Sequence, residues 1–186
     1  MTRPNRPFVV RPCRLGDVTG ISGVLKASWH AAHDHILGQR QSSIAGQRLY
    51  SRLNLAIFIA QSILWPRAST ILVATRDGDA VGYAMAQRDA AEIVLYTLYV
   101  HPDWQGRGIG SALLDAAIAA HTDAAAIRLE VLKDNAAAIA WYKTRGFAIY
   151  GETGNATGLA NVAALYMDRK LDRTGSPDPA ALTGGT

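Results

Sequence analysis

A glycine-rich turn between a β-rich run and an amphipathic helical run constrains this sequence most. Glycine stands at positions 106, 108 and 110, and the residues that follow at helical spacing are Ile109, Leu113, Ala116 and Ala117. Alternating glycines let several N–H groups turn to one point, and a helix start adds unpaired N–H groups and a partial positive charge. The segment therefore predicts a phosphate-binding site. Close helix packing alone would account for one or two of the glycines.

The spacing excludes the two familiar nucleotide-binding loops. The dinucleotide pattern G-x-G-x-x-G requires a third glycine where Ser111 or Leu113 stands. The P-loop pattern G-x-x-x-x-G-K-[ST] requires Gly and Lys where Ser111 and Ala112 stand. The phosphate compound is therefore expected to be bound by another kind of loop.

Hydrophobic periodicity predicts a mixed α/β sheet with helices on both faces. Strands are expected at residues 8–11, 70–75, 80–87, 92–100, 126–132, 148–152 and 162–169, and helices at 108–120 and 136–145. Asp77-Gly78 predicts a hairpin between the second and third strands. Asp17 is expected to cap a first helix. A second helical region, Ser43 to Leu64, is expected to direct inward Ile44, Leu49, Leu53, Ile57 and Ile63.

Charge and composition argue against several classes of partner. The net charge of +4 arises from four arginines within residues 1–14, because the rest of the chain has equal numbers of basic and acidic residues. This distribution indicates no nucleic-acid partner. The longest apolar-rich run, residues 55–65, is too short to cross a membrane. The lone Cys13 excludes a disulfide within the chain, and with no signal peptide visible a cytoplasmic location is expected.

Two segments around the glycine turn resemble the GNAT superfamily of acyl-CoA-dependent N-acyltransferases. Residues 105–110, QGRGIG, match the signature Q/R-x-x-G-x-G/A, and residues 96–114, YTLYVHPDWQGRGIGSALL, are similar to the fourth strand and following helix of that family. Residues 128–147, RLEVLKDNAAAIAWYKTRGF, resemble its fifth strand and an Asn-initiated helix. The resemblance covers about residues 8–171. It implies a mostly antiparallel sheet with a parallel pair that splays at the cofactor site.

The resemblance implies acetyl-CoA as the co-substrate and no metal. N–H groups of the glycine turn would bind the pyrophosphate, and the end of the fourth strand would hold the pantetheine arm. The expected cofactor-binding residues are Leu98, Tyr99, Val100, Gln105, Gly106, Arg107, Gly108, Ile109, Gly110, Ser111 and Asn135. Asn135 has an equally good structural explanation as the cap of the helix that starts at Ala136. Arg145-Gly146-Phe147 is explained by its structural role as the end of a helix, so no chemical role is assigned to these residues.

Tyr142 is the catalytic residue that the resemblance implies, as a general acid toward the coenzyme sulfur. Reference pKa values of about 10 for Tyr and about 8.5 for a thiol make full proton transfer unfavourable by roughly 2 kcal/mol. A hydrogen bond to the developing thiolate serves as well. The alternative is a buried aromatic residue with a packing role only.

The acceptor side is less defined. Deprotonating an amine of pKa near 10.4 at pH 7 costs about 4.6 kcal/mol, so a base is expected. Glu92 is the candidate, although many family members carry a Glu about where Val94 stands, and Glu130 is a rival; both are also explained as solvated carboxylates. By resemblance to small-substrate members, Trp29 and His33 are expected to line the acceptor pocket. His30, His33 and Asp34 share a helical face, but no further ligand pattern supports a metal site.

These observations predict one N-acetyltransferase domain, residues 8–171, between a flexible basic start (1–7) and a mobile tail (172–186). It would transfer acetyl from acetyl-CoA to the primary amine of a small molecule by direct attack in a ternary complex, since no cysteine lies in the motif segments to carry the acetyl group. A non-catalytic acyl-CoA-binding sensor and an acetyltransferase for protein amines are the alternatives. The oligomeric state is left open between monomer and homodimer.

Overall fold

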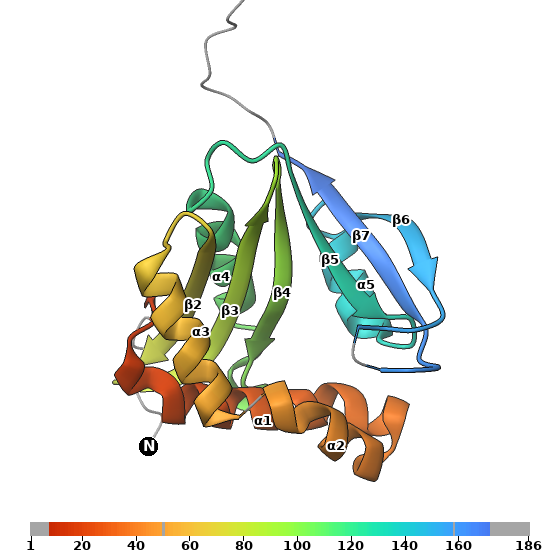
Figure 1. Ribbon diagram of the computed structural model, residues 1–186. Helices are drawn as coiled ribbons and strands as arrows, with labels where there is room; N and C mark the ends of the chain where they lie inside the picture. Colours follow the sequence, from red (N-terminus) through yellow and green to blue (C-terminus); the bar gives the residue numbers. More distant parts are fainter. Residues whose placement is uncertain (1–7, 50, 158, 172–186) are drawn as a thin grey trace, which may run out of the picture.

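A mixed sheet with helices on both faces forms the described part of the chain, residues 8–49, 51–157 and 159–171 of this computed structural model (Figure 1). The elements are β1 (Val9–Pro12), η1 (Leu15–Asp17), α1 (Val18–Leu37), α2 (Gln39–Leu49), α3 (Arg52–Leu64), β2 (Ser69–Arg76), β3 (Asp79–Asp89), β4 (Glu92–Val100), η2 (Pro102–Trp104), α4 (Ile109–Ala119), β5 (Ala126–Leu132), α5 (Ala136–Lys143), β6 (Ala148–Thr153) and β7 (Ala164–Lys170). The predicted basic start and tail lie outside the described residues.

The sheet separates between its two central strands. Its order is β1-β2-β3-β4-β5-β7-β6, and every pair is antiparallel except β4 and β5. The parallel pairing runs only from Glu92↔Ala126 to Leu95↔Leu129. Tyr96 is then an extra residue in β4 opposite β3, a β-bulge that bends the strand. Beyond it, β4 and β5 diverge toward α1 and α2 (Figure 1). The expected splayed parallel pair is confirmed.

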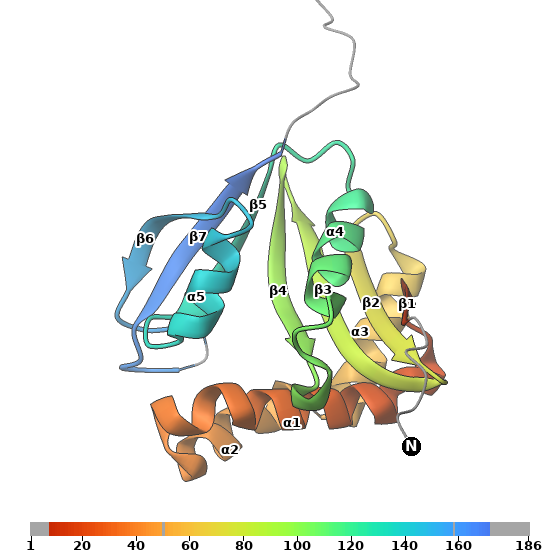
Figure 2. The same cartoon turned by 180° about the vertical axis from the view of Figure 1, so that it is seen from behind.

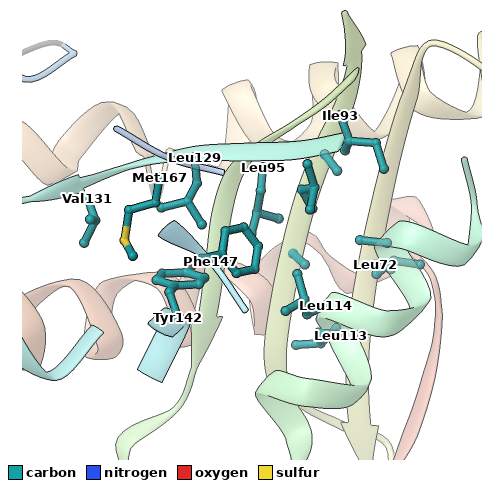
Figure 3. Packing of buried hydrophobic residues seen from close by; sticks show 14 of the residues in the cluster. Leu72, Ile93, Leu95, Leu113, Leu114, Leu129, Val131, Tyr142, Phe147 and Met167 are labelled. Atoms are coloured by element: carbon teal, nitrogen blue, oxygen red, sulfur yellow. The ribbon is translucent and has the colours of Figure 1, made fainter. Parts of the chain in front are cut away.

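Two hydrophobic clusters cover the two faces of the sheet. On one face α1 and α3 bury Ile21, Leu25, Leu55 and Ile59. On the other face lie α4 and α5 (Figure 2). There, Leu113 and Leu114 of α4 and Tyr142 of α5 belong to a cluster that includes Leu95 and Leu129 of the two central strands (Figure 3). Coverage of β4 by α1 on one face and by α4 on the other explains why its apolar residues show little alternation in sequence.

Several local predictions hold. The bounds predicted for β4 and β5 coincide with the observed strands. Asp77 and Gly78 both have positive φ, 51° and 93°, which is the conformation that a two-residue hairpin turn requires. None of the helices in the described ranges has both the length and the apolar character that a bilayer crossing demands.

The expected inward positions of the second helical region are wrong. Ile44, Leu53, Ile57 and Ile63 are exposed, and the buried residues of α3 are instead Leu55 and Ile59; the side chain of Leu49 lies outside the described residues. Ser51 caps α3, so the region contains two helices and one periodicity does not run through both. Because α3 is apolar on all sides, its sequence does not identify the buried face.

Contrary to expectation, the side chain of Asp17 does not cap α1. The residue occupies the cap position, but its carboxylate accepts hydrogen bonds from Arg11 Nη1 and Nη2 at 2.7 and 2.8 Å and from the Arg14 N–H at 2.8 Å. The hydrogen bond from Arg11 is the main reason that the pKa of Asp17 is lowered. The residue therefore fastens β1 to the start of α1.

Gly82 of β3 lets α4 pack closely on the sheet. A Cβ at this position would lie 2.9 Å from both Ile109 Cγ2 and Leu113 Cδ1. We expect Gly82→Ala to lower the free energy of unfolding by about 1–3 kcal/mol, measured by urea denaturation, because it overpacks this interface. Gly23→Ala is the control, since a Cβ there meets nothing within 4 Å and α1 should gain roughly 0.5–1 kcal/mol. Equal free energies of unfolding for the two variants would contradict close packing of α4 against Gly82.

Candidate active site

A pocket of about 800 Å³ lies where β4 and β5 have separated. Its walls come from α1, the end of β4, the glycine turn (residues 105–111), the first turn of α4, and α5 with the loop before it. Segments far apart in sequence therefore meet at one end of the sheet. All the residues expected to bind the cofactor line this pocket except Arg107.

The glycine turn exposes a row of backbone N–H groups. Gly106 and Gly108 have φ of 72° and 81°, and Gly108 is the N-cap of α4. The first helical hydrogen bond joins Ala112 N–H to the Gly108 carbonyl at 3.0 Å, which leaves the N–H groups of residues 108–111 without partners in the helix. A Cβ on Gly106 or Gly108 would meet nothing within 4 Å, so there is open space beside both of these pocket-lining glycines. This arrangement fits a phosphate group.

Gly110 differs from Gly106 and Gly108 because it lies at a packing contact between helices. A Cβ there would lie 3.2 Å from Trp141 Cζ2 of α5, and also contact Leu98 and Val100. The missing side chain thus allows α5 and α4 to approach each other. The packing explanation considered for these glycines applies to Gly110, and the anion-binding explanation fits Gly106 and Gly108.

Trp104 braces the glycine turn. The guanidinium carbons of Arg76 and Arg107 lie 4.4 and 4.6 Å from the centroid of its ring. Arg107 also donates a hydrogen bond from Nη2 to the Asp103 carbonyl, at 3.4 Å. The Arg107 side chain is therefore held on Trp104, and the part in cofactor binding expected for its backbone N–H stays a prediction.

The end of β4 keeps one edge without a strand partner. Leu98, Tyr99 and Val100 still pair with β3, but the β5 pairing ends at Leu95. The Val100 carbonyl accepts hydrogen bonds from Ser28 Oγ at 3.0 Å and Gln105 Nε2 at 3.2 Å. Gln105 thus closes the turn with its side chain. The other backbone groups of this edge fit an extended polar chain such as pantetheine.

Tyr142 contributes a hydroxyl to the pocket. The residue is buried, and its ring meets Phe147 and Trp141 edge-on, with centroids 5.3 and 5.0 Å away. The hydroxyl makes no hydrogen bond to any other described residue. Burial raises the pKa of Tyr142, and burial also raises that of Tyr99, with Tyr142 as a smaller cause. Both phenols are therefore neutral donors at physiological pH.

Asn135 caps α5 and also lines the pocket. Its Oδ1 accepts a hydrogen bond from the Ala138 N–H at 3.1 Å, which confirms the structural explanation. The amide nitrogen is a donor that the cap does not use. Ligand contact through that nitrogen is compatible with capping.

Contrary to expectation, Trp29 and His33 do not line the pocket. Trp29 Nε1 donates to the Ser42 carbonyl of α2 at 2.8 Å, and its ring stacks on His33 at 4.1 Å. Burial is the main cause that lowers the pKa of His33. The side chains of α1 that line the pocket instead are Ser28, Ala31, Ala32 and His35. Trp29 and His33 join α1 to α2 behind this wall, where His33 touches Tyr99.

The structure does not bring Glu92 to the pocket, so we do not retain it as a general base. Glu92 lies at the closed end of the β4–β5 pair, with Oε2 3.2 Å from Arg128 Nε. Six residues of strand lie between it and Tyr99, which places the two roughly 20 Å apart along β4. Glu130 does not line the pocket either, and it accepts hydrogen bonds from Thr157 N and Oγ1 at 2.7 and 2.9 Å. The sequence identified the strand that carries Glu92 but not the end of that strand at which the pocket lies.

Besides the tyrosines and Arg145, two ionisable side chains belong to the described residues that line the pocket, His35 and Asp134. Both are exposed. No cluster of three or more potential metal ligands occurs in the described ranges.

Trp141 and Arg145 are pocket residues that our sequence reasoning missed. The guanidinium carbon of Arg145 lies 3.7 Å from the Trp141 ring centroid, and Nη2 donates to Ser111 Oγ at 2.7 Å. The spacing of four residues in a helical run indicates the first contact. No local signal indicates the second, since Ser111 is 34 residues away in sequence.

Comparison with known proteins agrees with this geometry. The model of the acetyltransferase (GNAT) family matches residues 39–147. An uncharacterized N-acetyltransferase of Mycobacterium tuberculosis is 38% identical over 115 residues, which are 60% of this chain and 73% of that protein. The [ribosomal protein bS18]-alanine N-acetyltransferase of Escherichia coli is 39% identical over 75 residues, 39% of this chain and 51% of that protein.

Solved structures share the fold at low identity. The PaiA N-acetyltransferase of Thermoplasma acidophilum, in complex with coenzyme A, is 21% identical with a TM-score of 0.79, covering 89% of this chain and all of that one. The ribosomal-protein-S18-alanine N-acetyltransferase of Escherichia coli is also 21% identical, with a TM-score of 0.66, covering 92% of this chain and 99% of that one.

Proposed function

This chain belongs to the acetyltransferase (GNAT) family, whose members use acetyl-CoA, and we propose that it transfers the acetyl group directly to a primary amine held at the open end of the sheet. One observation carries the proposal. The exposed N–H groups of the glycine turn, the unpaired edge of β4 and the Tyr142 hydroxyl line a single pocket. Such a pocket holds a thioester and an amine in line, which contributes several kcal/mol to the rate through proximity.

Tyr142 would act on the leaving sulfur. The amine nitrogen forms a bond to the thioester carbon, the C–S bond breaks, and the thiolate that departs accepts a hydrogen bond from the phenol. Because burial raises the pKa of Tyr142, complete proton transfer to the sulfur is even less favourable than reference values indicate. The phenol therefore stabilises the developing negative charge as a neutral donor.

The proton of the attacking amine needs another route. His35 and Asp134 stand where the pocket is exposed, so a proton would leave toward them or directly to water. Without a buried carboxylate in the described pocket wall, amines of low pKa have an advantage. An α-amine of pKa near 7.7–8 costs about 1 kcal/mol to deprotonate at pH 7, against about 4.6 kcal/mol for an alkyl amine.

Contacts between the end of α1 and the β5–β7 half of the sheet favour a small-molecule acceptor. Ile36 and Leu37 at the end of α1 pack in one cluster with Leu132 of β5 and with Leu159 and Val162 of the β6–β7 loop. These contacts join the two halves of the divided sheet. They narrow the approach for a folded substrate and leave room for a compact one.

The α-amine of a protein is a second candidate, favoured by the similarity to the Escherichia coli alanine N-acetyltransferase and by the low pKa of such amines. This chain spans about half the length of that relative. A flexible amino terminus, unlike a folded surface, can enter a narrow pocket.

Release of CoA thiol from acetyl-CoA in the presence of an acceptor panel tests the proposal. The panel contains small alkyl amines, a peptide with a free α-amine, and the same peptide blocked at its α-amine but with a free lysine. We expect acceptor-dependent release well above hydrolysis. Binding of acetyl-CoA without release for any amine would indicate the non-catalytic sensor. Preference for the free α-amine peptide over the small amines would favour the second candidate.

A further inference from the structure

Arg145 holds a positive charge at the pocket wall that the transfer step does not use. Its guanidinium lies over the Trp141 ring, and Nη2 donates to Ser111 Oγ at 2.7 Å. Nη1 donates to the Trp141 carbonyl and to Thr144 Oγ1, both at 3.0 Å. Four contacts thus fix this half-buried side chain between α5 and the first turn of α4.

The charge of Arg145 has no acidic partner within the described residues. Arg11, Arg88 and Arg128 each form an ion pair with an aspartate, but no carboxylate lies within ion-pair distance of Arg145. The hydrogen bonds that Arg145 donates to described residues use three of its five N–H groups. The other two, on Nε and Nη2, have no acceptor in the described part of the chain. A half-buried guanidinium of this kind is stabilised by an anion.

The position of Arg145 indicates which anion. Its hydrogen-bond partner Ser111 lies in the first turn of α4. It is the last in the row of residues 108–111, whose N–H groups have no acceptor in the helix. Trp141, beneath the guanidinium, approaches α4 through the space left by Gly110. Arg145 and the row of N–H groups therefore line the same part of the pocket, and both favour negative charge.

We propose that Arg145 binds a phosphate group of CoA through its two remaining N–H groups. The planar fork of a guanidinium matches two phosphate oxygens, and it would add a charged side chain to a site otherwise built of backbone N–H groups. The inference rests on acetyl-CoA as the co-substrate. It does not depend on the acceptor or on the transfer step.

Calorimetric titration of the full chain with CoA, dephospho-CoA and pantetheine tests this role without turnover. We expect Arg145→Gln to raise the Kd for CoA by about 10- to 100-fold and to weaken its dependence on salt, while the Kd for pantetheine changes less than about twofold. Lys143→Gln is the matched control, because it removes the same charge from an exposed side chain of α5 that does not line the pocket.

The ligands separate the two sources of phosphate. An equal loss for CoA and dephospho-CoA assigns Arg145 to the pyrophosphate, and a loss confined to CoA assigns it to the 3′-phosphate. An unchanged Kd for CoA, or an equal loss for pantetheine, would overturn the proposal. If Arg145→Gln fails to fold, Arg145→Lys provides the same comparison, with a smaller loss expected for CoA and none for pantetheine. Wild-type protein that binds CoA but transfers no acetyl group would reject only the proposed function.

Discussion

Replacing Tyr142 with Phe should lower kcat by about 100-fold or more while the Kd for acetyl-CoA stays within about twofold, because the variant removes one donor to the leaving sulfur. The ring and its contacts with Phe147 and Trp141 remain. The lost hydroxyl has no hydrogen-bond partner among the described residues, so the fold should keep its stability. Single-turnover kinetics measures the chemical step, and calorimetry measures binding.

The pH dependence sharpens this expectation. Because burial raises the pKa of Tyr142, the phenol is neutral from about pH 6 to 9, and the loss in kcat should be constant across that range. Tyr96→Phe is the control, since Tyr96 is exposed on β4 and does not line the pocket. Glu92→Gln should likewise leave kcat within about twofold. A Tyr142→Phe enzyme with wild-type kcat in single turnover would remove the phenol from the mechanism.

The second half of the fold could be predicted from sequence because its signals are local. Turn residues bound the apolar runs of β4 and β5, and the glycines fix the geometry between β4 and α4. The amino-terminal helices carry no comparable signal. The apolar residues of α3 surround the helix, and only packing against α1 and the sheet selects Leu55 and Ile59 for burial.

The site was predictable only where one segment builds it. The glycine turn needs nothing beyond its own backbone to expose N–H groups, so its pattern predicts it. Glu92 and Trp29 depend on distant elements: the separation of β4 from β5 decides which end of the strand is open, and Ser42 of α2 takes the indole N–H of Trp29. Arg145 likewise acquires its position from Ser111. Contacts across tens of residues are invisible to periodicity.

Replacing Gly108 with Val should weaken acetyl-CoA binding by at least about 100-fold, because two effects act at this position. Gly108 caps α4 with φ of 81°, a conformation that costs an L-residue roughly 1–2 kcal/mol. The new side chain would also occupy open space at Gly108, which lines the pocket and where no protein atom lies within 4 Å of a Cβ. A phosphate and a valine cannot share that space. Calorimetry with acetyl-CoA gives the affinity.

Gly78→Val separates the blocked site from backbone strain. Gly78 has φ of 93° in the β2–β3 hairpin, and a Cβ there also meets nothing within 4 Å. Both variants should therefore lose similar thermal stability, yet only Gly108→Val should lose affinity. Equal affinity in the two variants would show that the open space before α4 does not hold the phosphates. Loss in both would trace the effect to strain transmitted through the sheet, since α4 packs on β2 and β3.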